Sequence, residues 1–202
     1  MLARVDDLLR GKGRHAPGGG RVLWGEIILL GMAGGFVYGA VMGTYSGRFL
    51  QALFSALKVP LLLAVSSLLC LPSFFVVNCL LGLRQDFAAA CRGLLGAQAA
   101  LALSLAALAP LLAVAYQSID RYEQATISNG LAFALATAGG QLALARHYAP
   151  LIRANPRHRT ARRFWVLCYV FVAVQMAWVL RPFIGAPGLS TRFFRENAWS
   201  NA

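Results

Sequence analysis

The residues that could carry out chemistry in this chain are few, and their spacing does not group them. The 202 residues include three histidines and seven acidic residues, without a G-x-x-x-x-G-K-[ST], H-E-x-x-H or G-x-S-x-G motif. His147 and His158 lie in a basic stretch, with no carboxylate or cysteine placed beside them to form a metal site or a catalytic base. The four cysteines form no C-x-x-C pair, which favours free buried thiols over a disulfide framework or a zinc site. They are Cys70, Cys79, Cys91 and Cys168. We therefore expect no enzyme activity, no cofactor and no bound metal.

The shortage of charge is the most informative feature of the composition. Hydrophobic residues make up 58% of the chain and charged residues 13%, whereas about a quarter of a soluble domain is charged. Polar groups are thus too few to cover a surface in water, and lipid is the expected surrounding. The net charge is +12, but the basic residues stand between apolar runs instead of forming one face for nucleic acid. We expect contacts with membrane lipids and none with nucleic acid.

Five charge-free stretches predict the architecture. They cover 27–47, 59–83, 93–119, 124–145 and 164–180. A helix of about 20 apolar residues crosses a hydrocarbon core of roughly 30 Å, and Arg181 can reach the headgroups from the end of the shortest stretch. The stretches are continuously apolar and do not alternate, which favours helices over barrel strands. We predict an all-α, polytopic bundle of about five transmembrane helices, of which 124–145 is the most polar.

The distribution of Lys and Arg predicts the orientation. Thirteen of these residues lie in 1–26, 84–92 and 146–163, and six lie in the connections on the other side. Because basic connections stay in the cytoplasm, we expect a cytoplasmic N-terminus and an outside C-terminus. The many Arg, Ala and Leu residues indicate a bacterial protein and hence the inner (plasma) membrane.

These spans divide the chain into three parts. We expect a flexible basic tail over 1–22, a five-helix domain over 23–183 and an extramembrane interfacial tail over 184–202.

The segment between the first two spans has its own pattern. Five apolar residues recur at helical spacing, and polar residues occupy the other positions. They are Phe49, Leu50, Leu53, Phe54 and Leu57, with Arg48, Gln51, Ser55 and Lys58 between them. This pattern is typical of a short helix that lies in the membrane interface. The alternative is that these residues extend the second span, whose expected first turn holds Pro60.

Four glycines lie four residues apart along the first span: Gly31, Gly35, Gly39 and Gly43. Together they form a ridge without side chains, on which another helix backbone can pack closely. We assign them to a helix-packing interface. The pattern leaves open whether the second helix belongs to this chain's own bundle, to another copy or to a partner.

The expected spans hold uncharged polar side chains, and no ionisable residue lies near the middle of one. These polar residues are Ser66, Ser67, Asn78, Gln98, Asn129, Gln141 and Gln175. Hydrogen bonds between such side chains stabilise helix packing by about 0.6–2 kcal/mol each. Without a buried ionisable group, a proton relay or a charge-coupled transport cycle lacks its usual carrier. Pro72 and Pro110 are deep enough to kink their helices, and a kink can open a cavity between spans.

Two basic segments are candidate contact sites. In 146–163, arginines can hold the connection against anionic lipid at about 1 kcal/mol each, or can act only as a topology signal. They are Arg153, Arg157, Arg159, Arg162 and Arg163. After the last span, arginine and aromatic residues can form an interfacial belt or contact a partner. They are Arg181, Phe193, Phe194, Arg195 and Trp199.

The five-span plan with a cytoplasmic N-terminus resembles the Yip1 family of small polytopic membrane proteins. The central hairpin of its bacterial members is similar to KVPLLLAVSSLLCLPSFFVVNCLLGL followed by RQDFAAACRGLLGAQAALALSLAALAPLLAVAY. The closing MAWVLRPFIGAPGLSTRFFRE also resembles a tail of uncharacterised bacterial membrane proteins. The likeness covers about 60–202 and implies a role in membrane organisation or trafficking-like assembly, with no catalytic residues. Eukaryotic relatives act with small GTPases through longer N-terminal regions, and the short tail here departs from that pattern.

Two main functions remain open from the sequence, and an intramembrane enzyme is a third with the least support. The preferred one is a non-enzymatic scaffold or accessory subunit of a membrane complex, which binds another membrane protein or a second copy. The alternative is a channel or transporter component for a neutral or lipid-like substrate. A polar cavity lined by Asn78, Gln98 and Gln175 would favour transport, and a dry bundle with a large apolar side surface would favour a subunit.

Overall fold

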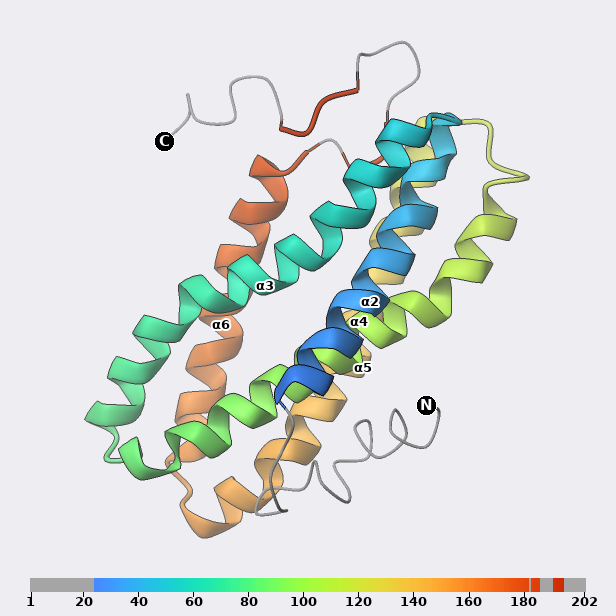
Figure 1. Cartoon of the computed structure of the whole chain (residues 1–202). Helices are drawn as coiled ribbons and strands as arrows, with labels where there is room; N and C mark the ends of the chain where they lie inside the picture. Colours follow the sequence, from blue (N-terminus) through green and yellow to red (C-terminus); the bar gives the residue numbers. More distant parts are fainter. Residues whose placement is uncertain (1–23, 182, 186–190, 195–202) are drawn as a thin grey trace.

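The computed structural model describes residues 24–181, 183–185 and 191–194, and the secondary structure in these residues is helical (Figure 1). The order is α2 (Trp24–Gly43), η2 (Thr44–Ser46), α3 (Phe49–Leu80), η3 (Arg84–Asp86), α4 (Phe87–Ala115), α5 (Tyr122–Ala154) and α6 (His158–Val179), where η marks a short 3-10 helix. Five of these helices are long and apolar enough to cross a membrane. The prediction of an all-α bundle with five spans is thus confirmed. The basic tail expected over 1–22 lies outside the described residues.

The helices extend beyond the stretches that predict them, most clearly around the last connection. The expected connection 146–163 is largely helical, because α5 continues to Ala154 and α6 begins at His158. Helix α5 includes Pro150 and is followed by Asn155, whose backbone is extended (φ −146°, ψ 115°). Extended backbone is the conformation that the following Pro156 imposes on its neighbour. The turn between α5 and α6 is therefore short.

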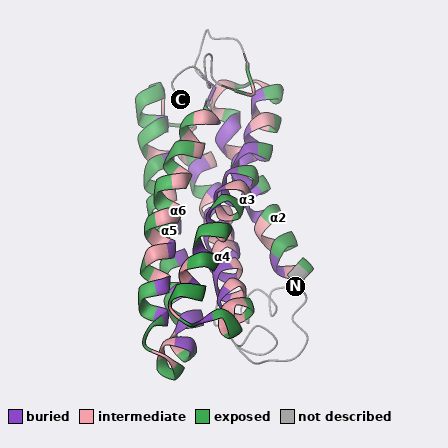
Figure 2. Cartoon of the chain, turned by 90° about the vertical axis from the view of Figure 1, so that its left-hand side faces the viewer, coloured by how far each residue is buried: buried purple, intermediate pink, exposed green. Residues whose placement is uncertain are grey.

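Helix α2 lies between the two halves of the bundle. It packs along both α3 and α4, while α4 also packs on α5 and α3 also packs on α6. The turn between α3 and α4 is tight and contains Gly82 at φ +72°. The two helices diverge from that turn and have few direct contacts (Figure 1). Buried residues line the inner faces of the bundle and exposed residues its outer faces (Figure 2).

The glycines of the first span explain how closely α2 and α3 approach. Gly35, Gly39 and Gly43 are buried against α3. A Cβ on Gly39 would overlap the backbone carbonyl of Ser55, and a Cβ on Gly43 would lie 2.5 Å from the Cα of Ala52. Only a residue without a side chain fits between two backbones at this distance.

The other face of α2 packs on α4 through two further glycines. A Cβ on Gly31 would stand at an ordinary 3.5 Å from the Cα of Ala99, but one on Gly34 would meet the carbonyl oxygen of Ala102 at 2.8 Å. Gly34 is outside the four-residue repeat, so the sequence pattern did not single it out. The glycine ridge therefore contacts this chain's own helices, and its face is not open to another copy.

An interfacial helix would expose its polar face to water, but the first turns of α3 bury theirs. Gln51, Ser55 and Lys58 are fully buried and face the protein, whereas Phe49 is 85% exposed. These turns are continuous with the rest of α3, which places Pro60 inside the helix and not in its first turn. The prediction of a separate interfacial helix is wrong, because the polar face of these turns packs against the protein and their apolar face is exposed.

Candidate functional site

A chain of hydrogen bonds joins α2, α4 and α5 at the end of the bundle near η2. The Tyr38 hydroxyl donates to Asn129 Oδ1 at 2.9 Å, and Asn129 Nδ2 donates to the Tyr116 hydroxyl at 2.6 Å. The Tyr116 hydroxyl donates in turn to the carbonyl of Met42 at 3.3 Å. A network satisfied in this way holds three helices together and does not form an open polar pore.

The described residues after α6 fold back onto this same end of the bundle. We call residues 183–185 and 191–194 the strap. Ile184, which the sequence analysis places in the extramembrane tail, is only 5% exposed and belongs to the core cluster around Tyr38 and Met42. A Cβ on Gly185 would lie 2.9 Å from the Gln51 side chain. This part of the strap is therefore a component of the helix bundle.

The strap supplies hydrogen-bond acceptors to the buried polar face of α3. The carbonyl of Phe183 accepts hydrogen bonds from Gln51 Nε2 (2.9 Å) and from the Ser55 hydroxyl. The carbonyl of Arg192 accepts one from Lys58 Nζ at 3.3 Å. Polar groups buried without partners are costly. The strap backbone thus allows three polar residues, spaced i, i+4 and i+7, to be buried on one face of a membrane helix.

Two ionisable residues that flank the predicted charge-free stretches are buried within the longer helices of the structure. Lys58 is fully buried in α3, and the ring centroid of Phe193 lies 5.2 Å from its Nζ. His147 is 3% exposed in α5, and its Nδ1 lies 2.7 Å from the carbonyl oxygen of Ala143. A prediction based on charge-free stretches ends each span before a charged residue. The helices continue past these two positions because protein groups surround both side chains.

At the opposite end, the α5–α6 turn is bonded to the α3–α4 turn. His158 is fully buried, and its Nε2 lies 3.1 Å from Asp86 Oδ2. Arg157 Nη1 donates to the carbonyl of Leu81 at 3.2 Å. The prediction that His158 has no carboxylate partner is therefore wrong. Asp86 precedes His158 by 72 residues, and only the folding of the two hairpins brings them together.

Replacing Asp86 with alanine should lower the stability of the bundle by about 2 kcal/mol, because it leaves a buried imidazole nitrogen without its partner. Thermal unfolding of the purified protein in mild detergent measures this loss. Asp86→Asn keeps an acceptor oxygen and should retain most of the stability. Asp120→Ala, at an exposed aspartate, is the matched control and should change little. An equal melting temperature for Asp86→Ala and Asp120→Ala would contradict a structural role for the bond.

The arginines expected to contact anionic lipid surround this end. Arg153, Arg159 and Arg163 are exposed and Arg162 is half-buried, whereas Arg157 is held by its bond to Leu81. Arg157 thus has a role within the fold. Lipid contact by the other four stays a prediction.

The aromatic and arginine residues of the C-terminal segment contact their own chain where they are described. The Arg181 guanidinium lies 4.8 Å from the ring centroid of Trp178. Phe193 packs edge-to-face on Phe54 and on Phe194, with ring centroids 5.3 Å and 4.9 Å apart. Arg195 and Trp199 lie outside the described residues.

Comparison with known proteins does not indicate a function for this chain. No family model, curated protein or solved structure matches this chain. The resemblance to the Yip1 family therefore stays a prediction from the sequence. Within the described part of the chain, no group of three or more His, Cys, Asp or Glu residues could hold a metal ion.

The three polar residues that would line a transport cavity have different surroundings in the structure. The Asn78 amide donates to the carbonyl of Phe74 in its own helix at 2.8 Å, and Gln98 Oε1 accepts from the Tyr169 hydroxyl at 3.1 Å. Gln175 is exposed on α6. Gln98 lines a pocket among the described residues, and neither Asn78 nor Gln175 contributes to its wall.

The outer face of α6 is the least covered surface of the bundle. Only 11% of its most apolar stretch is buried, against 33–44% for the other four helices. Large side chains are exposed along it: Leu167, Val170, Phe171, Val174 and Trp178. Gln175 lies among them, as a polar group on an otherwise apolar face. Sequence reasoning singled out Gln175 as polar but had no signal for its outward direction.

Proposed function

We propose that this integral membrane protein is a non-enzymatic accessory subunit or scaffold of a membrane complex, and that α6 contacts the partner. The observation that carries the proposal is the exposed amide of Gln175. It lies about 9 Å along the helix axis from Arg181 and about 18 Å from Arg163, at 1.5 Å per residue. Both arginines mark the edges of a hydrocarbon core of roughly 30 Å. The amide is therefore expected to lie within the core.

An amide that faces lipid tails has no water to bond, which is unfavourable. A neighbouring transmembrane helix removes this penalty by accepting or donating a hydrogen bond. The exposed apolar side chains around Gln175 then supply the packing surface. Because these side chains cover most of the length of α6, a whole transmembrane helix fits this face better than a small ligand does.

The proposed location is the bacterial inner membrane, with the N-terminus in the cytoplasm. Its support is the excess of Lys and Arg in 1–26, 84–92 and 146–163. In the bundle, the start of α2 and the α3–α4 and α5–α6 turns lie at one end (Figure 1). The basic segments between described helices thus share one side.

Purification from native membranes in mild detergent, followed by mass spectrometry of the intact assembly, tests the proposal. We expect a stoichiometric membrane protein partner, or a second copy for a self-assembling scaffold. Replacing Gln175 with leucine should lower the association constant by about 3- to 30-fold, because one interhelical hydrogen bond contributes about 0.6–2 kcal/mol.

A photocrosslinker at Phe171 should mark the partner helix in the same assembly. Thr137→Val removes a polar group from the exposed side of α5 and is the matched control, which should associate like the original chain. A reproducible monomer, or an assembly that Gln175→Leu leaves unchanged, would contradict the proposal.

The alternative function, a transporter component for a neutral or lipid-like substrate, has one supporting observation. A lateral apolar groove separates parts of α3 and α4, and its opening is exposed.

A further inference from the structure

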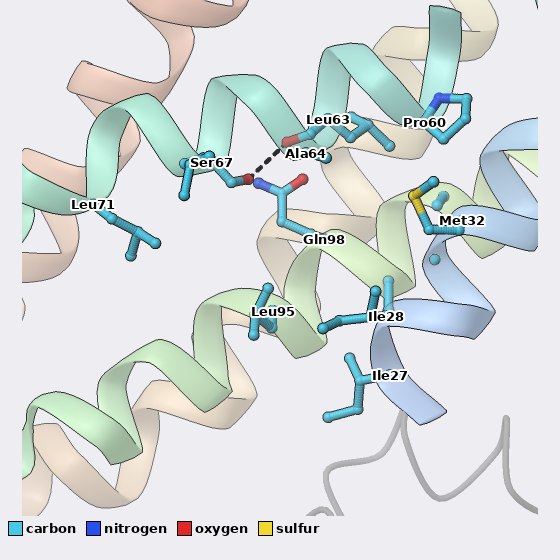
Figure 3. Close-up of a pocket in the computed structure, with 14 residues that line it drawn as sticks. Ile27, Ile28, Met32, Pro60, Leu63, Ala64, Ser67, Leu71, Leu95 and Gln98 are labelled. Atoms are coloured by element: carbon cyan, nitrogen blue, oxygen red, sulfur yellow. Dashed lines mark hydrogen bonds between the residues drawn. The ribbon is translucent and has the colours of Figure 1, made fainter. Parts of the chain in front are cut away.

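The lateral groove lies between α2, α3 and α4 and has a volume of about 230 Å³ (Figure 3). It exists because α3 and α4 diverge from their common turn while α2 packs on both. Apolar side chains form most of its wall, and three of them mark its opening because they are themselves exposed: Ile28, Met32 and Leu68. The groove is therefore open to the hydrocarbon region of the membrane.

Two polar side chains interrupt this apolar wall. Gln98 projects from α4 and Ser67 from α3, and the Gln98 amide nitrogen lies on the side of Ser67 (Figure 3). The Ser67 hydroxyl donates to the carbonyl of Leu63 at 2.8 Å. A hydrogen bond to α6 fixes the orientation of the Gln98 amide, because its Oε1 accepts from the Tyr169 hydroxyl at 3.1 Å.

This arrangement presents amide N–H groups to the groove. Among the residues that the structure describes, none accepts a hydrogen bond from Gln98 Nε2. In hydrocarbon, an N–H group without an acceptor is unfavourable. A bound molecule that carries an acceptor oxygen would relieve this cost, whereas a plain acyl chain would fill the space and leave the amide unsatisfied.

The size, charge and depth of the groove narrow the chemistry of its occupant. An apolar cavity of about 150 Å³ holds a benzene molecule, so 230 Å³ accommodates one substituted ring. None of the described residues that line the groove is charged, which favours a neutral molecule as the occupant.

Gln98 lies about 9 Å along α4 from Arg92, at 1.5 Å per residue. The ester carbonyls of glycerolipids stay near the edge of the hydrocarbon core, which is shallower than this depth. We propose that the groove binds a neutral lipid of the quinone class. Its ring carbonyl accepts a hydrogen bond from Gln98 Nε2, and its apolar tail leaves through the opening into the bilayer.

Fluorescence titration of the full chain in lipid nanodiscs tests this site. The probe is a benzoquinone with a ten-carbon tail, whose ring quenches tryptophan emission. Trp165 reports on the site because it stacks on Tyr169 with ring centroids 6.0 Å apart, and Tyr169 bonds Gln98. We expect quenching that saturates at one probe per chain.

Two variants remove the site by different means. Ala64→Phe fills the groove from an exposed position of α3, and Gln98→Leu removes the donor. Each should weaken binding by about tenfold, the effect of losing a contact or a hydrogen bond worth about 1.4 kcal/mol. Ala107→Phe adds the same ring at an exposed position of α4 outside the groove and should bind the probe like the original chain.

Quenching that rises without saturation, or with one affinity in all four proteins, would overturn the proposal. So would a glycerolipid that stays bound in the groove and that the probe does not displace. Melting temperatures of the variants show whether each is folded before the titration. The result is independent of whether α6 binds a partner, because Gln175 does not line the groove.

Discussion

Replacing Gly39 with alanine should destabilise the bundle by about 3 kcal/mol, because adding a methyl group to a filled interface forces the backbones apart. The added Cβ would overlap the carbonyl of Ser55 and lie 2.9 Å from the Cα of Ala56. These atoms belong to the backbone of α3 and cannot move as a flexible side chain can. Thermal unfolding in detergent, followed by size-exclusion chromatography of heated samples, measures the loss.

Gly130→Ala is the matched control for this prediction. Gly130 is also inside a helix, but a Cβ there would meet no atom within 4 Å. Alanine is a better helix former than glycine by about 1 kcal/mol, so this variant should be as stable as the original chain or slightly more stable. If Gly39→Ala unfolded at the same temperature as Gly130→Ala, the close approach of α2 and α3 would be wrong.

The same geometry predicts a graded response along the ridge. Gly43→Ala should be nearly as damaging as Gly39→Ala, because its Cβ would lie 2.5 Å from the Cα of Ala52. Gly31→Ala should be tolerated, since its nearest neighbour would be at 3.5 Å. A sequence repeat alone treats these positions as equivalent.

Replacing Ile184 with aspartate should release the strap from the bundle. A carboxylate cannot stay in the apolar cluster that holds Ile184, and loss of the apolar contact contributes further, so we expect a destabilisation of about 3 kcal/mol. Once the strap leaves, the polar face of α3 becomes accessible. A cysteine introduced at Ser55, in a chain without its native cysteines, should then react with a membrane-impermeant maleimide.

Ile184→Val is the matched control, since it removes one methyl group and should cost about 1 kcal/mol. It should leave the cysteine at position 55 protected. Equal labelling in Ile184→Asp and Ile184→Val would show that something other than the strap covers Ser55. The melting temperatures of the two variants give an independent measure of the same contact.

The strap, the outer face of α6 and the lateral groove are tested by different measurements. The strap variants report on stability and on access to the end of α3. The Gln175 variant reports on association, and the Gln98 variant reports on binding of a neutral lipid. Each residue lies in a different contact environment, so one result does not predict the others.

The number and type of elements could be predicted from the sequence alone. Lipid excludes unpaired backbone groups and unpaired charges, so charge-free stretches of sufficient length predict spanning helices without knowledge of their neighbours. The glycine repeat likewise predicted close packing of α2, because absence of a side chain is a local property.

The tertiary structure decided which way each polar side chain faces and what it bonds. The first turns of α3 have the same residue pattern whether they lie in the interface or in the bundle, and only the strap, more than 120 residues further along the chain, explains why Gln51 is buried. The bond between His158 and Asp86 depends on two turns that meet in space. The outward direction of Gln175 depends on α6 packing chiefly against α3. A local pattern cannot contain this information, because each of these side chains depends on a partner, or on the lack of one, that is distant in the sequence.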